Sequence, residues 1–564
     1  MAKQIEDLEK KAAQSTTAVN NMIGIRRGEL LKSVGALVGR AVKQPAPFAK
    51  NLKEYGKEVV KIVKGESELA PERRDRRFMD PTWRYNRLYK AGLQNWLAAR
   101  KGFEGWISDS GISEEDQARS RFLFDILADS FAPTNTLLGN PAAMKRLYES
   151  GGMSVVKGVQ NAYKDLTTNG GMPSMVDKSK FEVGKNLAMS EGSVVFKNEM
   201  LEIIQYKPLT DKVYKTPLVI IPPQINKFYA NDLSAHNSVI KYFASQGYQM
   251  FAVSWRNPSR QHSHWGLENY VQSLIEGTDV VMKITKSKKF NVSGACSGGA
   301  TLSLFLSELA ARGDTRVNSY TLMVCVLDPK KTDSDVGLFA SDAGIEAARK
   351  MSHKKGILPG EDLAKVFAWM RPNDLIWNYV VNNYLLGEDP PAFDILYWNA
   401  DTTNLPAQLH SDYLDMFADE RFVAVDENQG SGVEFMGNEI NLKKIKVDGF
   451  MLAGVTDHIT PWRASYRNTA LFGGNVDFVL ASSGHIQSLL TAPGNPKAKF
   501  FTGKKIEETC DEWIETAEEN PGSWWPHWDA WLKQRSGELK VPPRNQGNKS
   551  FPPLCKAPGE YVFT

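Results

Sequence analysis

The pattern of apolar and polar positions divides the chain into two parts with different predicted secondary structure. Over about the first 200 residues, apolar side chains recur at a spacing close to the helical repeat, which predicts a mostly helical region. The positions that carry this pattern are Leu30, Leu31, Val34, Leu37 and Val38, followed by Tyr55, Val59, Val60 and Val63. Turn-forming residues in the segment TTNGGMPS, which ends at Ser174, predict a loop before the second part.

After about Leu201, short β-branched runs alternate with helical stretches, as in βαβ units with a mainly parallel sheet. Several of the runs are continuously apolar, which is typical of strands covered on both faces. The seven predicted strands are Ile203–Tyr206, Leu218–Ile221, Met250–Val253, Phe290–Ser293, Leu322–Val326, Phe450–Ala453 and Val476–Ala481.

The alternation fails between Asp328 and about Asn441, where prolines and aromatic clusters such as FDILYWN replace it. We interpret this stretch as a cap inserted over the sheet. The predicted organisation is therefore an N-terminal, mostly helical region over residues 1–200 and an α/β catalytic domain over residues 201–564, with the cap at about 329–441.

Composition and charge narrow the function classes. The 564 residues are 42% apolar and 24% charged, which is ordinary for a globular protein, and the formal net charge of +4 argues against a nucleic-acid binder. Up to Lys64, 13 basic residues stand against 6 acidic ones, so the chain begins with a basic arm. A basic amphipathic arm can lie on an apolar or anionic surface, or its apolar face can pack on its own protein.

The first residues, MAKQIEDLEKK, are charged where a secretory signal needs an apolar stretch, and no apolar run reaches the ~20 residues of a membrane span. The four cysteines form no CxxC pair, and the histidines have no spacing typical of metal ligands. We therefore expect a cytoplasmic protein with free thiols and without a metal or bound cofactor.

The strongest chemical motif is Gly294-Ala295-Cys296-Ser297-Gly298, which joins a predicted strand to a predicted helix. It is the G-x-S-x-G nucleophile elbow of α/β-hydrolases, with cysteine in place of serine. Small residues are needed there because the turn is sharp, and the N-terminus of the helix favours a thiolate. The alternative is a structural cysteine in a tight, glycine-rich connection.

Two further residues complete a triad in the order nucleophile, acid, histidine. Asp457 follows the strand Phe450–Ala453, and His485 follows the strand Val476–Ala481. Both positions lie at the carboxyl end of a strand, where catalytic groups collect in open α/β sheets. Asp328 also ends a strand, although it can be a simple turn cap. His458 adjoins Asp457, and we give it a supporting role.

An oxyanion hole needs two backbone N–H donors. The expected donors are Ser297, which follows the nucleophile, and Ile225 or a neighbour in the loop VIIPPQINKFY. The prolines of this loop are equally consistent with a rigid turn alone.

With these residues in place, the chain resembles a polyhydroxyalkanoate synthase from about Arg74 to about Pro542. The matching segments are PPQINKFYANDL, FAVSWRNPSR, GACSGG, FDILYWNADTTNLP, AGVTDHITPW, SGHIQ and PGSWWPHWDAWL. Within that family, APTNTLLGNPAAMKR, NGGMPS, FEVGKNLA and QSLLTAPGNPKA are most like the single-subunit, medium-chain-length enzymes, whereas PGSWWPHW is more like the short-chain branch.

The resemblance implies an α/β-hydrolase core in which Cys296 is acylated and Asp457 and His485 are its partners. It implies transfer of (R)-3-hydroxyacyl groups from CoA thioesters to a growing polyester, with CoA carried by the substrate and released. It further implies a homodimer in its active form at the surface of polyester granules in the cytoplasm, where granule-associated proteins can join it. Two rival hypotheses are a cysteine-dependent hydrolase, of thioesterase or dienelactone type, and a non-enzymatic granule coat protein.

Overall fold

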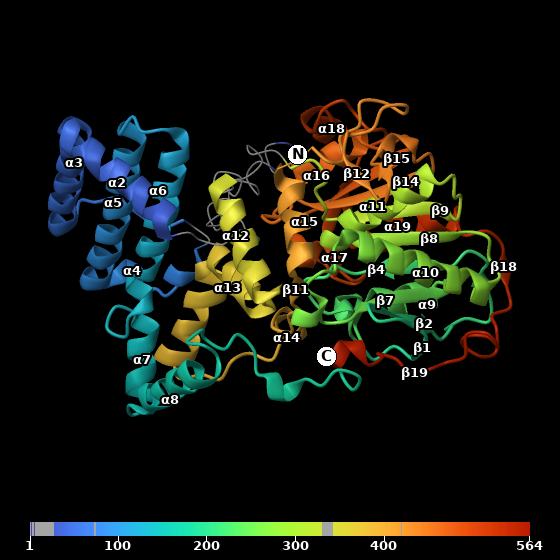
Figure 1. The fold of residues 1–564 in the computed structure, drawn as a ribbon. Helices are drawn as coiled ribbons and strands as arrows, with labels where there is room; N and C mark the ends of the chain where they lie inside the picture. Colours follow the sequence, from blue (N-terminus) through green and yellow to red (C-terminus); the bar gives the residue numbers. More distant parts are fainter. Residues whose placement is uncertain (1, 3–4, 6–26, 73–74, 330–341, 419) are drawn as a thin grey trace. The chain divides into compact units, whose positions relative to one another are not determined.

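The computed structural model describes residues 2, 5, 27–72, 75–329, 342–418 and 420–564 of the chain (Figure 1). The described residues form two compact units. The larger unit is built on Ser179–Ala364 and Asp394–Thr564, and the smaller one on residues 27–178 and Lys365–Phe393. This division differs from the predicted one in two places: the boundary lies at residue 178 instead of about 200, and part of the predicted cap belongs to the helical unit.

The smaller unit consists of helices, as predicted for the N-terminal region. They are α2 (Arg27–Lys43), α3 (Pro45–Lys64), α4 (Thr82–Tyr85), α5 (Arg87–Asp109), α6 (Glu114–Ser130), α7 (Pro141–Glu149) and α8 (Met153–Thr168). The predicted basic arm up to residue 26, and the side chains of Leu30, Leu31 and Val34, lie outside the described residues.

Helix α3 uses only part of its apolar surface to pack on its own protein. It lies against α5, where the hydroxyl of Tyr55 donates to Asn95 Oδ1 over 3.0 Å and Ile62 is buried. Val60 and Val63, which belong to the predicted apolar face, are exposed. Part of the apolar face of α3 therefore packs on its own protein, whereas Val60 and Val63 remain exposed to other surfaces.

The segment from the predicted cap joins the helical unit through polar contacts. Its π-helical turn η8 (Val380–Leu385) packs against α8. There the hydroxyl of Tyr384 donates to the buried carboxylate of Asp165 over 2.8 Å, and Asn161 Nδ2 donates to the carbonyl of Asn383 over 3.0 Å. Because these contacts join residues more than 200 positions apart, no local pattern in the sequence predicts them.

The larger unit contains an 11-stranded sheet with the order β17-β16-β15-β14-β9-β8-β4-β7-β2-β1-β19 (Figure 1). The six strands from β7 to β15 in that order are parallel, and the strands at both ends are antiparallel. The bounds are β1 (Gly192–Lys197), β2 (Leu201–Tyr206), β4 (Leu218–Ile221), β7 (Met250–Trp255), β8 (Phe290–Ala295), β9 (Val317–Met323), β14 (Asp448–Gly454), β15 (Val476–Ala481), β16 (Lys499–Thr502), β17 (Glu518–Pro521) and β19 (Cys555–Lys556).

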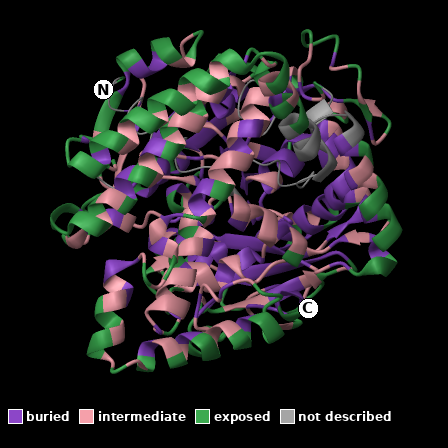
Figure 2. Cartoon of the chain, turned by 90° about the vertical axis from the view of Figure 1, so that its left-hand side faces the viewer, coloured by how far each residue is buried: buried purple, intermediate pink, exposed green. Residues whose placement is uncertain are grey.

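Helices cover both faces of this sheet, as the continuously apolar strands predict. Neighbouring residues of a strand point to opposite faces. Ile204 lies in a buried cluster with residues of α9 (Val239–Ser245) and α19 (Trp525–Lys533). Ile203 meets α10 (Leu267–Thr285), which approaches so closely that a Cβ on Gly277 would lie 2.8 Å from Ile203 Cδ1. Figure 2 shows the resulting pattern, with buried strands between helices whose outer faces are exposed.

The prediction of an α/β fold is confirmed, with one strand displaced. The structure places β9 at Val317–Met323 instead of Leu322–Val326. Its polar residues hide it from a hydrophobicity pattern because they are paired in the core: the hydroxyl of Ser319 donates to Asn291 Oδ1 over 2.8 Å, and that of Thr321 accepts from the indole of Trp528 over 3.0 Å. Hydrogen-bonded side chains of this kind can be buried at little cost.

The segment between β9 and β14 is an insertion, because these two strands are neighbours in the sheet and the elements between them are not part of it. Its described elements in the larger unit include α12 (Asp342–Lys355), β10 (Ile357–Leu358), α14 (Asp394–Asn399), β11 (Leu405–Pro406) and α15 (Ala407–Ala418). Helix α13 (Gly360–Met370) runs from one unit into the other. None of the helices in the described part of the chain has the length and apolar character that crossing a membrane requires.

Candidate active site

Cys296 stands at the turn between β8 and α11 (Ser297–Ala311) in a strained backbone conformation. Its φ of 52° and ψ of −125° lie where side chains other than glycine are rarely found. The turn is tight because a Cβ on Gly298 would lie 2.7 Å from the carbonyl oxygens of both Ile221 and Pro222. This geometry is that of a nucleophile elbow, as the G-x-C-x-G motif predicts.

The structure brings His485 and Asp457 together, although 28 residues separate them in the chain. His485 is the first residue of α17 (His485–Leu489), directly after the loop that follows β15, and Asp457 follows β14. The ring Nδ1 of His485 lies 2.7 Å from Asp457 Oδ2, and both side chains are buried. The other ring nitrogen is left for Cys296, whose side chain helps to raise the pKa of His485.

The charges in this cluster set the proton positions. Burial alone would lower the pKa of His485, but the carboxylate of Asp457 and the Cys296 side chain raise it to about 10. Burial would likewise raise the pKa of Asp457, but the imidazolium of His485 and the hydroxyl of Thr460 hold it below its ordinary value. At neutral pH the arrangement therefore favours a protonated His485 beside the Asp457 carboxylate.

Thr460 fixes the Asp457 carboxylate and has no role in the triad predicted from the sequence. Its hydroxyl donates to Asp457 Oδ2 over 2.7 Å and lies 3.2 Å from His485 Nδ1. The backbone N–H groups of Ile459 and Thr460 both donate to Asp457 Oδ1 over 2.9 Å. An aspartate that accepts from N–H groups two and three residues later is a common turn, so the spacing D-x-x-T is a signal that sequence reasoning could have used.

The two predicted oxyanion donors lie in segments that contact each other. The N–H of Gln224, next to Ile225, donates to Ser297 Oγ over 3.3 Å, and Ser297 Oγ donates to Gln224 Oε1 over 3.1 Å. Within the part of the chain that the structure describes, the backbone N–H groups of Ser297 and Ile225 have no hydrogen-bond acceptor. They are therefore free to bind an oxyanion, and that role stays a prediction.

The tryptophan-rich motif PGSWWPHW supports the helix that begins with His485. The indole N–H of Trp524 donates to the carbonyl of Ser488 over 2.7 Å, and that of Trp525 donates to the carbonyl of Leu489 over 3.1 Å. These carbonyls belong to the last turn of α17, where helical partners are missing. The motif thus holds the C-terminal end of the helix whose first residue is the histidine candidate, His485.

The rival residues have other partners. The carboxylate of Asp328 forms an ion pair with Arg467, whose Nη2 also donates to the Asp328 carbonyl over 2.7 Å. Asp457 holds the ring of His485. His458, which follows Asp457 in the chain, is half-buried. No group of three or more His, Cys, Asp or Glu side chains in the described residues has the geometry of a metal site.

The other three thiols are poor nucleophile candidates. Burial raises the pKa of Cys325, of Cys510 and of Cys555 above the ordinary value of a thiol, which disfavours the reactive thiolate. In the structure it is Cys296 whose thiol contacts a histidine held by a carboxylate.

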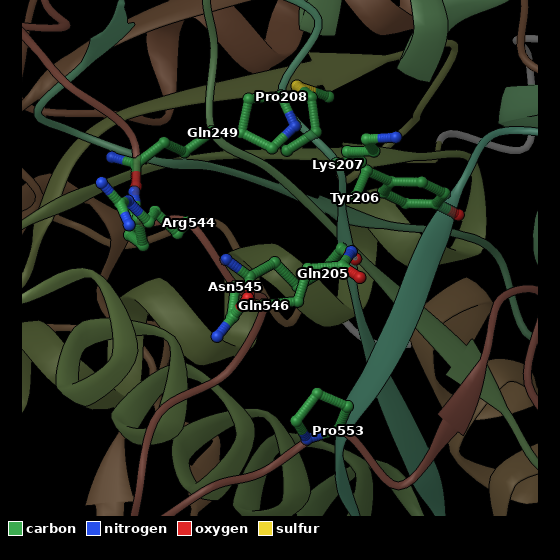
Figure 3. A pocket seen from close by; sticks show the side chains of 11 residues that line it. Gln205, Tyr206, Lys207, Pro208, Gln249, Arg544, Asn545, Gln546 and Pro553 are labelled. Carbon is green, nitrogen blue, oxygen red and sulfur yellow. Dashed lines mark hydrogen bonds between the residues drawn. The ribbon is translucent and has the colours of Figure 1, made fainter.

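Figure 3 shows a cavity of about 370 Å³ that residues such as Gln205, Gln249 and Arg544 line. Its lining includes Gln205 and Tyr206 at the end of antiparallel β2 and Met250 at the start of β7. The parallel strands begin at this edge of the sheet, whereas Cys296, Asp457 and His485 follow their carboxyl ends. The cavity therefore does not receive the group that reacts with Cys296.

Known proteins match nearly the whole chain. Residues 74–243 match the family described as "Poly-beta-hydroxybutyrate polymerase (PhaC) N-terminus", and residues 217–491 match the α/β hydrolase fold. "Poly(3-hydroxyalkanoate) polymerase 1" of Ectopseudomonas oleovorans is 48% identical over 99% of both chains. "Poly(3-hydroxyalkanoate) polymerase 2" of the same organism is 46% identical over 98% of both, and "Poly(3-hydroxyalkanoate) polymerase subunit PhaC" of Cupriavidus necator is 37% identical over 89% of this chain and 85% of its own.

Proposed function

The chain belongs to the poly(3-hydroxyalkanoate) polymerase family, and we propose that it polymerises by carrying the acyl group on Cys296, with His485 as the proton carrier and Asp457 as its partner. Its activity is that of an acyltransferase, as the resemblance noted in the sequence implies. The observation that carries the residue assignment is the buried pair of His485 and Asp457 beside the strained Cys296, at the carboxyl edge of the parallel sheet.

The first step is acyl transfer from the CoA thioester of an (R)-3-hydroxyacyl group to Cys296. His485 takes the proton of Cys296, and the thiolate attacks the carbonyl carbon. The resulting oxyanion accepts hydrogen bonds from the N–H groups of Ser297 and Ile225. The C–S bond to CoA then breaks, and His485 donates its proton to the CoA thiolate. A thioester is exchanged for a thioester, so the acyl group on Cys296 keeps its reactivity.

The second step forms the polyester. A hydroxyl group of the growing chain, or of a second substrate, gives its proton to His485 and attacks the acyl carbon on Cys296. The new ester bond forms as the bond to Sγ breaks, which returns the thiolate beside a protonated His485. Asp457 holds the ring through Nδ1, and its burial behind the ring favours this orienting role over direct contact with the hydroxyl.

Water must be kept from the acyl enzyme, and the inserted cap is suited to this role. We expect the cap to move, or to open by pairing with another subunit, when it admits CoA substrates and releases polymer. Crosslinking the cap in its closed position should then abolish turnover, and full turnover by the crosslinked enzyme would refute cap motion. A homodimer as the active form is part of the same proposal, and sedimentation during turnover tests it.

The insoluble product places the enzyme at a granule surface in the cytoplasm in this proposal. The exposed apolar side chains of the helical unit support such a contact, because exposed apolar surface next to basic residues favours an apolar phase with a polar boundary. Deleting the first 70 residues should weaken granule attachment. Unchanged attachment of the truncated protein would show that the contact lies elsewhere.

The decisive assay incubates the purified protein with 3-hydroxyacyl-CoAs of several chain lengths and measures CoA release and polymer mass together. Polymerisation gives both products, whereas a hydrolase releases CoA without polymer and a coat protein gives neither. The names of the relatives favour the polymerase over both rivals. The quoted medium-chain segments lead us to propose that longer acyl chains are preferred, and faster turnover of the four-carbon substrate would contradict that preference.

A further inference from the structure

A buried hydrogen-bond cluster around Gln224 joins the inserted segment to the loop that carries the second oxyanion donor. Gln224 directly precedes Ile225 and is 3% exposed. Its side chain lies among hydroxyl groups from two sources: Ser297 and Thr301 of the helix that follows Cys296, and Tyr413 of α15. All of these residues belong to the larger unit.

Every polar atom of the Gln224 side chain is occupied. Its Oε1 accepts from the hydroxyl of Tyr413 over 2.8 Å and from that of Ser297 over 3.1 Å, while its Nε2 donates to Thr301 Oγ1 over 2.9 Å. A primary amide buried in this way has one favourable orientation, because rotation or displacement would leave buried polar atoms unpaired. The side chain thus ties the loop to the N-terminal turn of α11.

The backbone of the same loop is held by Thr403, which is also part of the inserted segment. The hydroxyl of Thr403 donates to the carbonyl of Gln224, and its N–H donates to the carbonyl of Ile225 over 3.1 Å. A single β-bridge between Asn226 and Thr402 continues the contact. The carbonyls of Gln224 and Ile225, which stand before and after the Ile225 N–H in the chain, therefore both accept hydrogen bonds from Thr403 of the inserted segment.

The direction of the Ile225 N–H depends on these contacts, since a peptide group is planar and fixing its carbonyl fixes the opposing N–H. The N–H of Ile225 belongs to the same peptide group as the carbonyl of Gln224, which the Thr403 hydroxyl holds. An oxyanion donor contributes only when it is aimed before the charge develops. Moving the segment that bears Thr403 and Tyr413 would release this peptide group.

We propose that Thr403 and Tyr413 are positioning residues that complete the oxyanion hole only when the inserted segment is seated on the Gln224 loop. This inference rests on the proposed function, in which the Ile225 N–H stabilises the oxyanion. Its consequence is that an open enzyme, which admits water, lacks the donor that hydrolysis of the acyl thioester also needs. The acyl group would then be protected while the polymer or the CoA substrate exchanges.

The test compares two reactions of Cys296 in the full-length protein. Acylation by a 3-hydroxyacyl-CoA, followed as CoA released in the first turnover, passes through an oxyanion. Alkylation by iodoacetamide is a displacement at a saturated carbon and has no oxyanion. We expect Tyr413→Phe and Thr403→Val each to slow acylation about 10- to 100-fold, less than loss of a direct donor, with kcat falling more than KM changes. Alkylation should stay within about twofold, since the thiol and His485 are untouched.

Two controls separate positioning from general damage. Tyr248→Phe removes another buried tyrosine hydroxyl, one that donates to Asp529 at the far edge of the sheet, and should change neither rate. Thr403→Ser keeps the hydroxyl and should recover most of the acylation rate lost in Thr403→Val. Because both residues hold one loop, the double variant should be little slower than the slower single variant.

The inference is overturned if Tyr413→Phe and Thr403→Val acylate at the wild-type rate, or if acylation and alkylation fall by the same factor. These outcomes are distinct from failure of the proposed function, which appears as CoA release by the wild-type protein without polymer. Since each variant is compared with the wild type in the acylation step alone, the comparison holds for a polymerase and for a hydrolase.

Discussion

Cys296 combines two features that rarely occur together unless a residue reacts. Its backbone is strained, with φ at 52°, and its side chain contacts a histidine whose pKa is raised to about 10. Strained residues and shifted pKa values both concentrate at functional sites. Neither is visible in composition, but the G-x-C-x-G spacing already indicates the strain, because only a sharp turn needs those small neighbours.

The raised pKa of His485 predicts that activity is lost only at a high pH. The imidazolium must give its proton to the departing CoA thiolate, so kcat/KM should hold through neutral pH and fall as the pH rises through about 10. Asp457→Asn removes the carboxylate that raises this pKa. The variant should lose about 10²- to 10⁴-fold in kcat/KM, and its alkaline limb should move to lower pH. A pH profile of CoA release measures both effects, and an unmoved limb would show that Asp457 does not set the proton affinity.

Residue by residue, local motifs are enough to name Cys296, Asp457 and His485, each of which follows a predicted strand. The structure brings His485 and Asp457 together and places Cys296 at the elbow, and their catalytic roles stay a prediction. Gln224, Thr403 and Tyr413 could not be found in this way, because their relation arises from contacts between segments almost 200 residues apart. A buried polar residue in a loop has no distinctive neighbours in the sequence.

At the scale of elements, the site depends on how closely β4 and α11 approach. Gly298 makes this possible, since a Cβ there would lie 2.7 Å from the carbonyl oxygens of Ile221 and Pro222. The loop after β4 carries the proposed donor Ile225, so the spacing between this helix and strand would also set the width of the proposed oxyanion hole.

Gly298→Ala should therefore damage both stability and acylation. The added methyl group must push the end of β4 away, which should cost about 1–3 kcal/mol of the free energy of unfolding, as overpacking does. Gly92→Ala is the matched control, because Gly92 lies within α5 with nothing near its missing Cβ, and it should stabilise by up to about 1 kcal/mol. Urea unfolding gives both values, and equal effects of the two substitutions would contradict the predicted close approach.

The sequence pattern misses strands that are short, polar or at the edge of the sheet. Edge strand β17 (Glu518–Pro521) reads EENP, polar residues with a proline that only an edge tolerates. β19 has two residues, and β9 carries serine and threonine that find partners in the core. Periodicity detects strands that bury apolar side chains, so the centre of the sheet is predicted well and its edges are not.

At the scale of the whole molecule, the candidate site and the exposed apolar stripe of α8 lie in different units of the chain. The triad candidates and the Gln224 cluster belong to the larger unit. The smaller unit exposes an apolar stripe along α8 that consists of Met153, Val156, Val159, Tyr163 and Leu166. The opposite side of the helix is buried at Ser154, Gly158 and Asp165, so the stripe faces away from its own unit.

The α8 stripe should contribute to binding of the polyester surface. Replacing Val159 and Leu166 together by Glu should lower the fraction that sediments with isolated polyester granules at least about tenfold, because two exposed aliphatic side chains that would be buried against the polyester are lost. Lys164→Glu changes the charge of the same helix equally and should have a much smaller effect. Turnover of a soluble substrate should remain at the wild-type level in both variants. Undiminished sedimentation of the double variant would assign granule contact to another surface.

Mass spectrometry of the quenched enzyme tests most directly whether Cys296 carries the acyl chain. After brief reaction with a 3-hydroxyacyl-CoA and acid quench, we predict that the peptide containing Cys296 gains the mass of one or more 3-hydroxyacyl units. The adduct should be absent in Cys296→Ala, which should also form no polymer. Polymer formed by Cys296→Ala, or an acyl adduct on another residue while Cys296 stays free, would contradict the account.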